Sequence, residues 1–236
     1  MATVAIYSLK GGVGKTTLSV NLAWCAATLS ARRTLLWDLD PQAASTWVLG
    51  GSGKADQAQA MFSKDVPVAK QARPTAYPQL ELIAADASLR GLDQLFHELD
   101  KKKRLAKLLS ELAAYDRVIL DCPPGLTETA DQVMRAADLI VIPVIPSPLS
   151  TRAYDAVVQH LGGRTSLLPV HVMVDKRRAL HAEALARHSD WPIIPMASGI
   201  EAMAAKRAPV GVFAPKSGAA QAFADLWRRI EHRLVG

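Results

Sequence analysis

Short apolar segments recur along the chain and alternate with longer stretches in which polar residues return at regular intervals. Arg117–Asp121 and Leu139–Val144 are almost unbroken apolar runs, which is typical of parallel strands buried on both faces of a sheet. The other segments have the composition expected of neighbouring strands. We therefore predict strands over Thr3–Ser8, Thr34–Asp38, Leu80–Ala84, Arg117–Asp121, Leu139–Val144, Leu167–Val174 and Trp191–Pro195.

Helical periodicity occupies most of the chain between these strands. Leu105, Leu108, Leu109 and Leu112, for example, recur at the spacing of a single helix face. Asp56–Ala76 is weakly patterned, and we expect a helix only at its start. Helices are predicted over Thr17–Leu29, Glu128–Ala137, Leu149–Leu161, Arg178–His188, Ile200–Lys206 and Ser217–Leu234, and one or two helices over Leu92–Ala114.

This order of elements indicates an α/β fold. Strands that alternate with helices build a parallel sheet whose crossover helices cover both faces. We predict a three-layer, doubly wound, mainly parallel β-sheet. One domain is expected to span residues 1–236.

Composition and charge narrow the class of protein. Half of the residues are hydrophobic and 21% are charged, which is ordinary for a globular protein. The sequence lacks both a membrane-spanning apolar run and a secretory signal, and Cys25 and Cys122 suggest no disulfide framework, so we expect a cytoplasmic location. The net charge is +6, and residues 152–236 carry twelve Lys and Arg against seven Asp and Glu. An excess of positive charge in one part of a chain favours a nucleic-acid partner.

The strongest motif lies between the first predicted strand and the first helix. It reads Lys10-Gly11-Gly12-Val13-Gly14-Lys15-Thr16-Thr17. Its glycines allow a tight turn in which successive N–H groups face one concavity, and the helix start favours a phosphate chain there. Lys15 is expected to reach the β- and γ-phosphates, and the Thr16 hydroxyl to bind Mg²⁺. The loop is a variant, because Leu9 stands where the usual motif has its first glycine, and Lys10 adds a second lysine.

Two predicted strands end in aspartates. Asp38 and Asp40 lie at the end of one strand, where alternation is expected to place both carboxylates on one side, and Asp121 ends another. Ligands of open α/β sheets bind at the carboxyl ends of the strands, so these side chains should converge on the glycine-rich loop. Carboxylate oxygens are suitable ligands for Mg²⁺. We predict a metal site at this edge of the sheet, where the Thr16 hydroxyl and the carboxylates of Asp38, Asp40 and Asp121 are candidate ligands.

Together these motifs resemble those of the ParA branch of the ParA/MinD deviant-Walker ATPases. Further matching stretches are Leu80–Leu89, Tyr115–Pro124, Ala137–Pro143 and Gly211–Ala220. The resemblance implies a slow ATPase that forms a homodimer with ATP, in which two subunits enclose two nucleotides. It implies the P-loop NTPase architecture for the sheet, and it implies that Lys10 crosses to the phosphates of the partner subunit. By the same resemblance, Lys15, Thr16 and Thr17 hold nucleotide and metal. Asp38 and Asp121 support Mg²⁺, the latter through water, and Asp40 orients the attacking water. Three weaker matches are expected to contact adenine: Asp175, Pro195 and Met196.

The same resemblance implies a cellular role. In this family ATP-bound dimers bind DNA without sequence preference, and a ParB-like partner stimulates hydrolysis and releases them. We therefore expect a nucleoid-associated protein that positions or partitions a plasmid, a chromosome or a protein cluster. Candidate DNA contacts are Arg164, Lys176, Arg177, Arg178, Lys206, Arg207, Lys216, Arg228 and Arg229. The run Lys101–Arg104 is interpreted instead as a solvated first turn of a helix.

Other members of the superfamily provide alternatives. A MinD-like membrane ATPase needs a detachable amphipathic C-terminal helix, and Phe223, Leu226, Trp227, Ile230 and Leu234 form an apolar stripe beside arginines. Because similar helices pack on the core in ParA-like proteins, we do not expect membrane contact. A nitrogenase-type reductase needs cysteines for a shared cluster, and neither cysteine suits that role. A synthetase acting on a small carboxylic acid is a further alternative. We expect no N-terminal helix-turn-helix and hence no operator autorepression.

Overall fold

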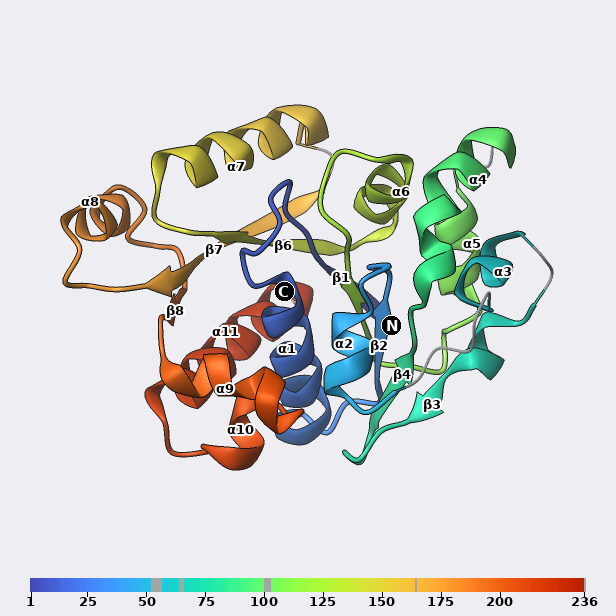
Figure 1. Ribbon diagram of the computed structural model, residues 1–236, viewed down its shortest axis with the longest axis horizontal. Coiled ribbons are helices and arrows are strands. Elements are labelled where there is room, and N and C mark those ends of the chain that lie inside the picture. The colour runs from blue at the N-terminus through green and yellow to red at the C-terminus, as the bar shows by residue number, and fades with distance from the viewer. Residues whose placement is uncertain (52–56, 64–65, 100–102, 164, 236) are drawn as a thin grey trace.

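An almost entirely parallel β-sheet forms the centre of the protein in the computed structural model (Figure 1). The structure describes residues 1–51, 57–63, 66–99, 103–163 and 165–235. The strand order is β3-β4-β2-β5-β1-β6-β7-β8, and only the β3–β4 pair is antiparallel. This order confirms the predicted doubly wound α/β fold. The strands are β1 (Ala2–Ile6), β2 (Thr34–Asp38), β3 (Arg73–Pro74), β4 (Leu80–Ile83), β5 (Arg117–Asp121), β6 (Leu139–Val144), β7 (Ser166–Val174) and β8 (Ile193–Pro195).

Helices cover both faces of this sheet and produce the three layers (Figure 1). The core against α1, α2, α9, α10 and α11 lies on one face, and the core against α3 to α7 lies on the other. The helices are α1 (Lys15–Leu29), α2 (Ala44–Val48), α3 (Gln57–Ser63), α4 (Leu92–Leu99), α5 (Arg104–Ser110), α6 (Glu128–Ala136), α7 (Pro148–Leu161), α8 (Ala179–Arg187), α9 (Ser198–Lys206), α10 (Val210–Phe213) and α11 (Gly218–Val235). Two single turns of 3-10 helix are η1 (Val68–Gln71) and η2 (Ala87–Gly91).

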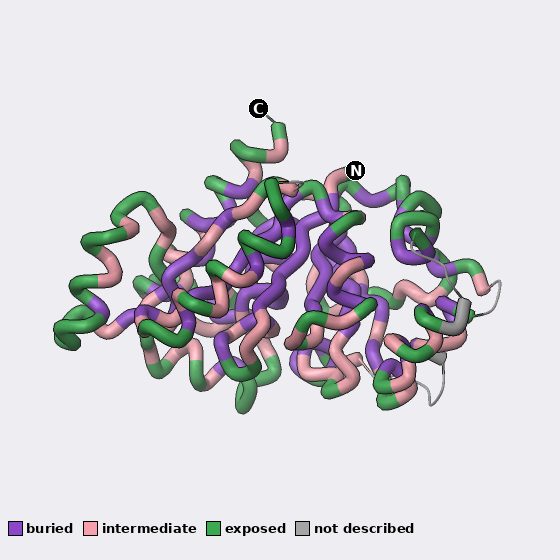
Figure 2. The backbone as a smooth tube through the Cα atoms, turned by 90° about the horizontal axis from the view of Figure 1, so that it is seen from above, coloured by how far each residue is buried: buried purple, intermediate pink, exposed green. Residues whose placement is uncertain are grey.

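The central strands are the most deeply buried part of the molecule (Figure 2). Every residue of β2, β5 and β6 is buried, because helices pack on both faces and a neighbouring strand lies at each edge. The apolar runs therefore give the bounds of these three strands correctly. The carboxyl ends of β1, β2, β4 and β5 lie together at one edge, since these strands are parallel.

Short elements account for most differences from the predictions. A helix at α2, a turn at η2 and a helix at α10 were not expected, and the weakly patterned Asp56–Ala76 region contains η1 and the two-residue strand β3. The helix α2 has five residues, which is too few for a helical period to be visible. It is held instead by side-chain hydrogen bonds to buried carboxylates, as described below.

The prediction of a solvated turn at Lys101–Arg104 is wrong for Arg104. This side chain is only 7% exposed, and its guanidinium donates hydrogen bonds to the carbonyls of Phe62 (3.1 Å) and Met61 (3.2 Å). Arg104 thereby satisfies carbonyl groups at the end of α3 that have no partner within that helix. Lys101 and Lys102 lie outside the described residues.

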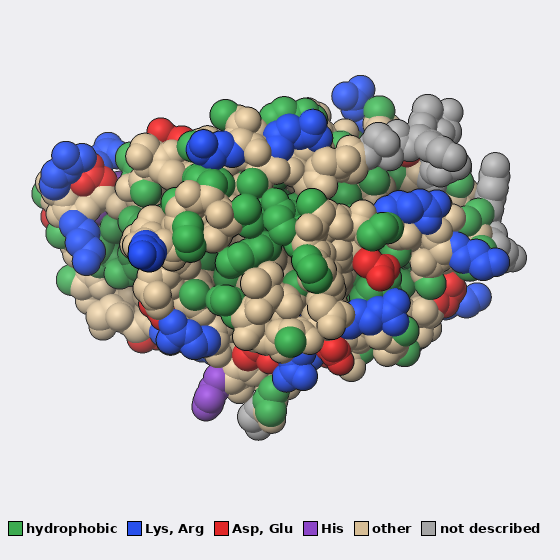
Figure 3. Space-filling view, turned by 90° about the horizontal axis from the view of Figure 1, so that it is seen from below, with side chains coloured by type: hydrophobic (Ala, Val, Ile, Leu, Met, Phe, Trp, Pro, Cys, Tyr) green, Lys and Arg blue, Asp and Glu red, His purple; other side chains and the backbone are tan. Residues whose placement is uncertain are grey.

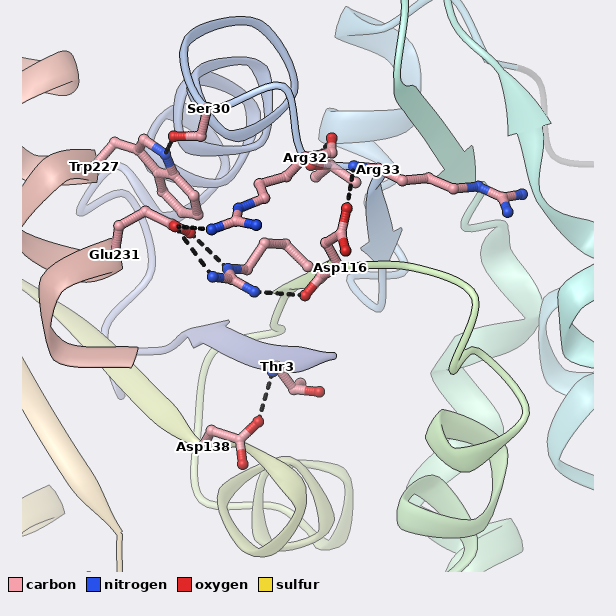
Figure 4. A network of polar contacts seen from close by, with 10 residues as sticks. Thr3, Ser30, Arg32, Arg33, Asp116, Asp138, Trp227 and Glu231 are labelled. Carbon is pink, nitrogen blue, oxygen red and sulfur yellow. Dashed lines mark hydrogen bonds and ion pairs between the residues drawn. The ribbon is translucent and has the colours of Figure 1, made fainter. Parts of the chain in front are cut away.

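The last helix, α11, is fixed to the amino end of the sheet. Its residues Phe223, Leu226, Trp227 and Ile230 are at most 1% exposed, and the Trp227 indole N–H donates to Ser30 Oγ at 2.8 Å. Glu231 accepts two hydrogen bonds from the Arg117 guanidinium and one from that of Arg32 (Figure 4). The carboxyl end of α11 and the start of β1 therefore lie on the same side of the molecule (Figure 2).

We expect Glu231→Ala to lower the free energy of unfolding by about 2–3 kcal/mol, because it leaves the buried Arg117 guanidinium without a carboxylate partner. The side chains of Arg117 and Glu231 are 9% and 16% exposed, and their shortest N–O distance is 2.6 Å. Urea unfolding followed by circular dichroism measures the change. Asp225→Ala on the same helix is the control: its ion pair with Arg228 is exposed, and the expected change is within about 0.5 kcal/mol. Equal effects of the two substitutions would contradict the stabilising role of this ion pair.

Candidate functional site

The glycine-rich segment forms a loop between the end of β1 and the start of α1. Gly12 and Gly14 adopt left-handed backbone angles, with φ of 70° and 86°, which residues with a Cβ rarely adopt. Gly14 directly precedes α1, and no side chain caps the first N–H groups of that helix. These groups carry the partial positive charge of a helix start, so the loop provides a ready site for an anionic group.

A cavity of about 750 Å³ opens over this loop. Its walls come from the loop itself, from the segment after β2, from the segment after β5 and from η2 with α4, and Met173 of β7 adds a side chain. Its size suits a nucleotide-sized ligand. The lining residues are Gly11, Gly12, Gly14, Lys15, Thr16, Thr17, Leu39, Asp40, Pro41, Gln42, Leu89, Arg90, Asp93, Pro123, Pro124, Thr127, Thr129 and Met173.

Lys15 supplies a buried positive charge at the base of the cavity. It is 7% exposed, and its ammonium group donates to the Lys10 carbonyl at 3.2 Å. Burial lowers the pKa of this ammonium group, while the nearby carboxylates of Asp121 and Asp40 act in the opposite direction. A bound phosphate chain would add negative charge next to Lys15 and favour its charged form further.

The Lys10 side chain lies elsewhere. It is half-buried and is not among the residues that line the cavity, and only its backbone groups form hydrogen bonds, to Ser8 Oγ and Lys15 Nζ, within the described part of the chain. In this chain the first lysine of the motif is thus separated from the cavity that the second one enters. Val13 is 2% exposed and does not line the cavity.

Asp38 and Asp121 lie side by side at the ends of β2 and β5, where they are register partners. Both are at most 1% exposed. Burial, together with the neighbouring Asp121 carboxylate, raises the pKa of Asp38 to about 8, and burial also raises the pKa of Asp121. Two adjacent buried carboxylates are costly without a compensating positive charge, so this pair fits a divalent cation.

Hydroxyl groups hold the two carboxylates in place. Asp38 Oδ2 accepts from Thr46 N (2.9 Å) and Thr46 Oγ1 (2.8 Å), and Asp121 accepts from Ser45 Oγ (2.5 Å) and Ser19 Oγ (3.0 Å). Ser45 and Thr46 belong to α2, so this helix is fastened directly to the carboxylate pair. The Thr16 hydroxyl acts to lower the pKa of the Asp121 carboxyl, against the effect of burial, so three of the predicted metal ligands (Thr16, Asp38 and Asp121) lie near one another.

Asp40 is placed differently from Asp38. Because β2 ends at Asp38, Asp40 lies beyond the strand, and strand alternation does not set the direction of its side chain. The Asp40 N–H donates to Asp38 Oδ1 at 3.1 Å, while the Asp40 side chain lines the cavity and accepts from the Gln42 N–H at 2.9 Å. Asp40 alone of the three aspartates is thus directly available to a ligand or water in the cavity.

The residues predicted to contact adenine form a group beyond this cavity. Asp175 accepts two hydrogen bonds from the Arg177 guanidinium, Pro195 is the register partner of Val174, and the Met196 N–H donates to the Val174 carbonyl. None of the three lines the cavity. The side chain that does so on this side is Met173, whose Cε lies 3.8 Å from the position of a Cβ on Gly14. Sequence reasoning missed Met173 because it lies inside an apolar run that reads as core.

The candidate DNA contacts that the structure describes are all exposed, but several already have partners within the chain. Arg177 pairs with Asp175 and Arg228 with Asp225, Lys206 lies over the Phe213 ring, and Arg207 lies over the ring of Trp47 and donates to its carbonyl. Lys and Arg side chains on the side where α9 and α10 lie surround an apolar area instead of forming one stripe (Figure 3). The other described candidates are Lys176, Arg178, Lys216 and Arg229, whereas Arg164 lies outside the described residues.

Both cysteines are inside the protein. Cys25 is 1% exposed within α1, and Cys122 is fully buried after β5. Burial raises the pKa of the Cys25 thiol to about 12 and that of Cys122 well above its usual value. Neither thiol can reach a partner subunit in this conformation, which argues against the shared-cluster alternative.

No helix among the described residues has both the length and the apolar character needed to cross a bilayer. The apolar stripe of α11 does not form a free surface either. Four of its five residues face the core, as described above, and Leu234 packs against the same core at its edge. An amphipathic helix that binds a membrane surface needs its apolar face free, and α11 buries that face in the core.

Known proteins resemble the chain both in sequence and in fold. The family model described as an AAA domain matches residues 1–163. The sporulation initiation inhibitor protein Soj of Bacillus subtilis is 38% identical over 146 residues, which are 60% of this chain and 57% of that protein. The chromosome partitioning protein ParA of Myxococcus xanthus is 37% identical over 150 residues, 60% of this chain and 51% of that protein. The chain thus spans little more than half the length of these relatives.

Two solved structures share the whole fold. A Cyanothece McdA(D38A)–ATP complex has a TM-score of 0.85 at 21% identity. The match covers 99% of this chain and 96% of the McdA chain. The septum site-determining protein MinD of Pyrococcus horikoshii, complexed with Mg-ADP, has a TM-score of 0.83 at 21% identity. The match covers 100% of this chain and 97% of the MinD chain. At these identities the likeness concerns the fold alone.

Proposed function

Because the chain belongs to the ParA/MinD type of P-loop ATPases, with an AAA domain over residues 1–163, we propose that it is an ATPase that switches between a monomer and an ATP-bound dimer. One observation carries this proposal: a single cavity brings together an uncapped helix start, the buried Lys15 ammonium and the Asp40 carboxylate, above the Asp38–Asp121 pair. These groups are what phosphoryl transfer from a nucleotide to water requires.

The positions of the residues suggest which of them bind phosphate, which position water and which hold the metal. The N–H groups of the loop and Lys15 hold the phosphate chain, and Asp40 orients the attacking water. Asp38, Asp121 and the Thr16 hydroxyl would hold Mg²⁺, either directly or through water. When bound, Mg²⁺ neutralises charge on the phosphates and on the buried carboxylate pair. Asp175, Pro195 and Met196 would contact the adenine next to Met173, if the ligand extends beyond the cavity toward β8.

Dimerisation gives Lys10 its role in this proposal. Its side chain is not engaged in the cavity of its own chain, so it is free to reach the phosphates of a second subunit that closes over the cavity. A lysine supplied from the partner subunit makes hydrolysis depend on dimer formation. Turnover is then slow without a further stimulus, which a ParB-like protein would provide.

The ATP-bound dimer is proposed to bind DNA without sequence preference and thereby to position or partition cargo. The positive excess in residues 152–236 supports this role. Among the described residues, four exposed candidates form no ion pair within the chain: Lys176, Arg178, Lys216 and Arg229. Two subunits double the positive charge of one surface, so binding should require the dimer. The proposed location is the nucleoid. Membrane targeting is not proposed, because α11 is packed into the core.

We expect the wild-type protein to bind random duplex DNA with ATP and not with ADP, with a Kd on the order of 10⁻⁴–10⁻⁶ M that rises steeply with salt. Lys10→Ala should bind ATP within about threefold of wild type but should remain monomeric and lose most DNA binding, because the contact across the interface is absent. Fluorescence anisotropy of labelled DNA and analytical ultracentrifugation measure both properties.

The exposed Lys70 of η1 provides the matched control, and Lys70→Ala should behave as wild type in both measurements. A Lys10→Ala protein that dimerises with ATP and binds DNA as wild type does would refute the switch. ATP-independent binding of equal strength would show that DNA affinity is unrelated to the nucleotide.

A further inference from the structure

One wall of the cavity has no role in the function proposed above. The chain leaves β4 at Ile83, forms the turn η2 and enters α4, and on this path it places Leu89, Arg90 and Asp93 against the cavity. These residues are distant in sequence from the glycine-rich loop and from the Asp-Leu-Asp segment. They nevertheless share a single cavity with both.

Hydrogen bonds make this wall rigid. Asp86 accepts from the N–H groups of Ser88 (2.8 Å) and Ala58 (2.9 Å), which fixes the start of η2. Asp93 Oδ1 accepts from both the N–H and the hydroxyl of Thr129, at 2.9 and 2.7 Å, which fixes the start of α4 against α6. The backbone between these two fixed points therefore has a defined position relative to the cavity, and it carries one side chain whose length lets it reach across that wall.

Arg90 is that side chain. It is exposed, and the structure records no hydrogen bond or ion pair for its guanidinium within the ranges it describes. Lys15 and Arg90 are the two cationic side chains among the residues that line the cavity. Asp93 follows on the next turn, but its Oδ1 is occupied by Thr129. An arginine that faces a phosphate-sized space without a carboxylate partner is suited to an anionic ligand.

The strand order indicates which part of a ligand Arg90 faces. Met173 of β7 lies on one side of the glycine-rich loop, which follows β1, and η2 follows β4 on the other side. The strands β5 and β2 lie between β1 and β4, so β1 and β4 are about 14 Å apart at the usual strand spacing. A nucleotide with its base toward β7 and its phosphates on the loop therefore extends its terminal phosphate toward the η2 side.

We propose that Arg90 binds the terminal phosphate of a nucleoside triphosphate held by the same chain, and so lets the site distinguish a triphosphate from a diphosphate. The inference rests on the proposed nucleotide-binding function and adds a specificity-determining residue to it. A guanidinium suits this task, because it offers paired N–H donors to two phosphate oxygens and remains charged at every physiological pH.

Separate titrations with a non-hydrolysable ATP analogue and with ADP test this role. Arg90→Gln should weaken binding of the triphosphate about 10- to 100-fold and leave ADP within about twofold, since charged hydrogen bonds to one phosphate are lost. Arg90→Lys should retain part of the discrimination. Arg135→Gln on α6, an exposed arginine outside the cavity, should change neither affinity.

The two proposals fail in different ways. If the wild type binds neither nucleotide, the proposed function is wrong. If wild type binds both and Lys15→Ala binds neither, but Arg90→Gln retains full preference for the triphosphate, the role of Arg90 alone is overturned. The titrations are repeated in the Lys10→Ala background to keep the protein monomeric. Loss of the Arg90 effect there would overturn its assignment to the nucleotide of its own chain.

Discussion

Lys15→Ala is expected to lower the affinity for both ATP and ADP at least 100-fold, the largest effect of any single substitution in the cavity. The lysine is 7% exposed and is the buried cation next to the loop. Its loss removes a desolvated charge from the phosphates, a change that costs about 2–5 kcal/mol in comparable buried pairs. It also leaves Asp40 and Asp121 to repel the incoming phosphates. Isothermal titration calorimetry measures the affinities.

A loss of nucleotide affinity in Lys15→Ala must be distinguished from a loss of the folded structure. Circular dichroism and the thermal midpoint report whether the variant is folded, and Lys107→Ala, at an exposed position of α5, is the matched control with unchanged affinity. Folded Lys15→Ala protein that binds ATP within threefold of wild type would show that the cavity over the loop is not the nucleotide site.

Asp40→Ala is expected to lower the rate of ATP hydrolysis by about 10²–10³-fold while ATP binding and dimer formation remain. The Asp40 carboxylate faces the cavity, whereas Asp38 and Asp121 are enclosed beneath it, so no other aspartate on this wall can position a water. The hydrogen bond from the Gln42 N–H keeps the carboxylate in place. Phosphate release under single-turnover conditions measures the rate.

Asp40→Asn tests the charge separately from the shape, and it should be nearly as slow as Asp40→Ala if the carboxylate itself is required. Asp155→Ala on the exposed face of α7 should hydrolyse ATP as wild type does. Full activity of Asp40→Ala would move the water-positioning role to another residue of the cavity.

The strands could be predicted from the sequence because burial on both faces leaves a local signal. Thr34–Asp38, Arg117–Asp121 and Leu139–Val144 have the predicted bounds, and each lies between two neighbours in the sheet. The loop before α1 was likewise visible, since its glycines are required by left-handed backbone angles at Gly12 and Gly14.

Features fixed by contacts between distant segments could not be predicted. The helix α2 depends on hydrogen bonds from Ser45 and Thr46 to carboxylates on two strands, and no local periodicity encodes these. Met173 enters the cavity because its φ of 54° and the irregular β7–β8 pairing turn it out of the strand pattern. Arg90 stands after β4, where the general rule that ligands lie at the carboxyl ends of strands predicts ligand-facing residues.

The side on which the chain ends lie has a practical consequence for experiments on the assembled protein. The start of β1 and the end of α11 lie at the amino edge of the sheet, and the cavity lies at the carboxyl edge. Fluorophores attached near either end would therefore point away from the surface across which two subunits are proposed to close. Single-molecule colocalisation of differently coloured copies could then follow assembly and release without obstructing the interface.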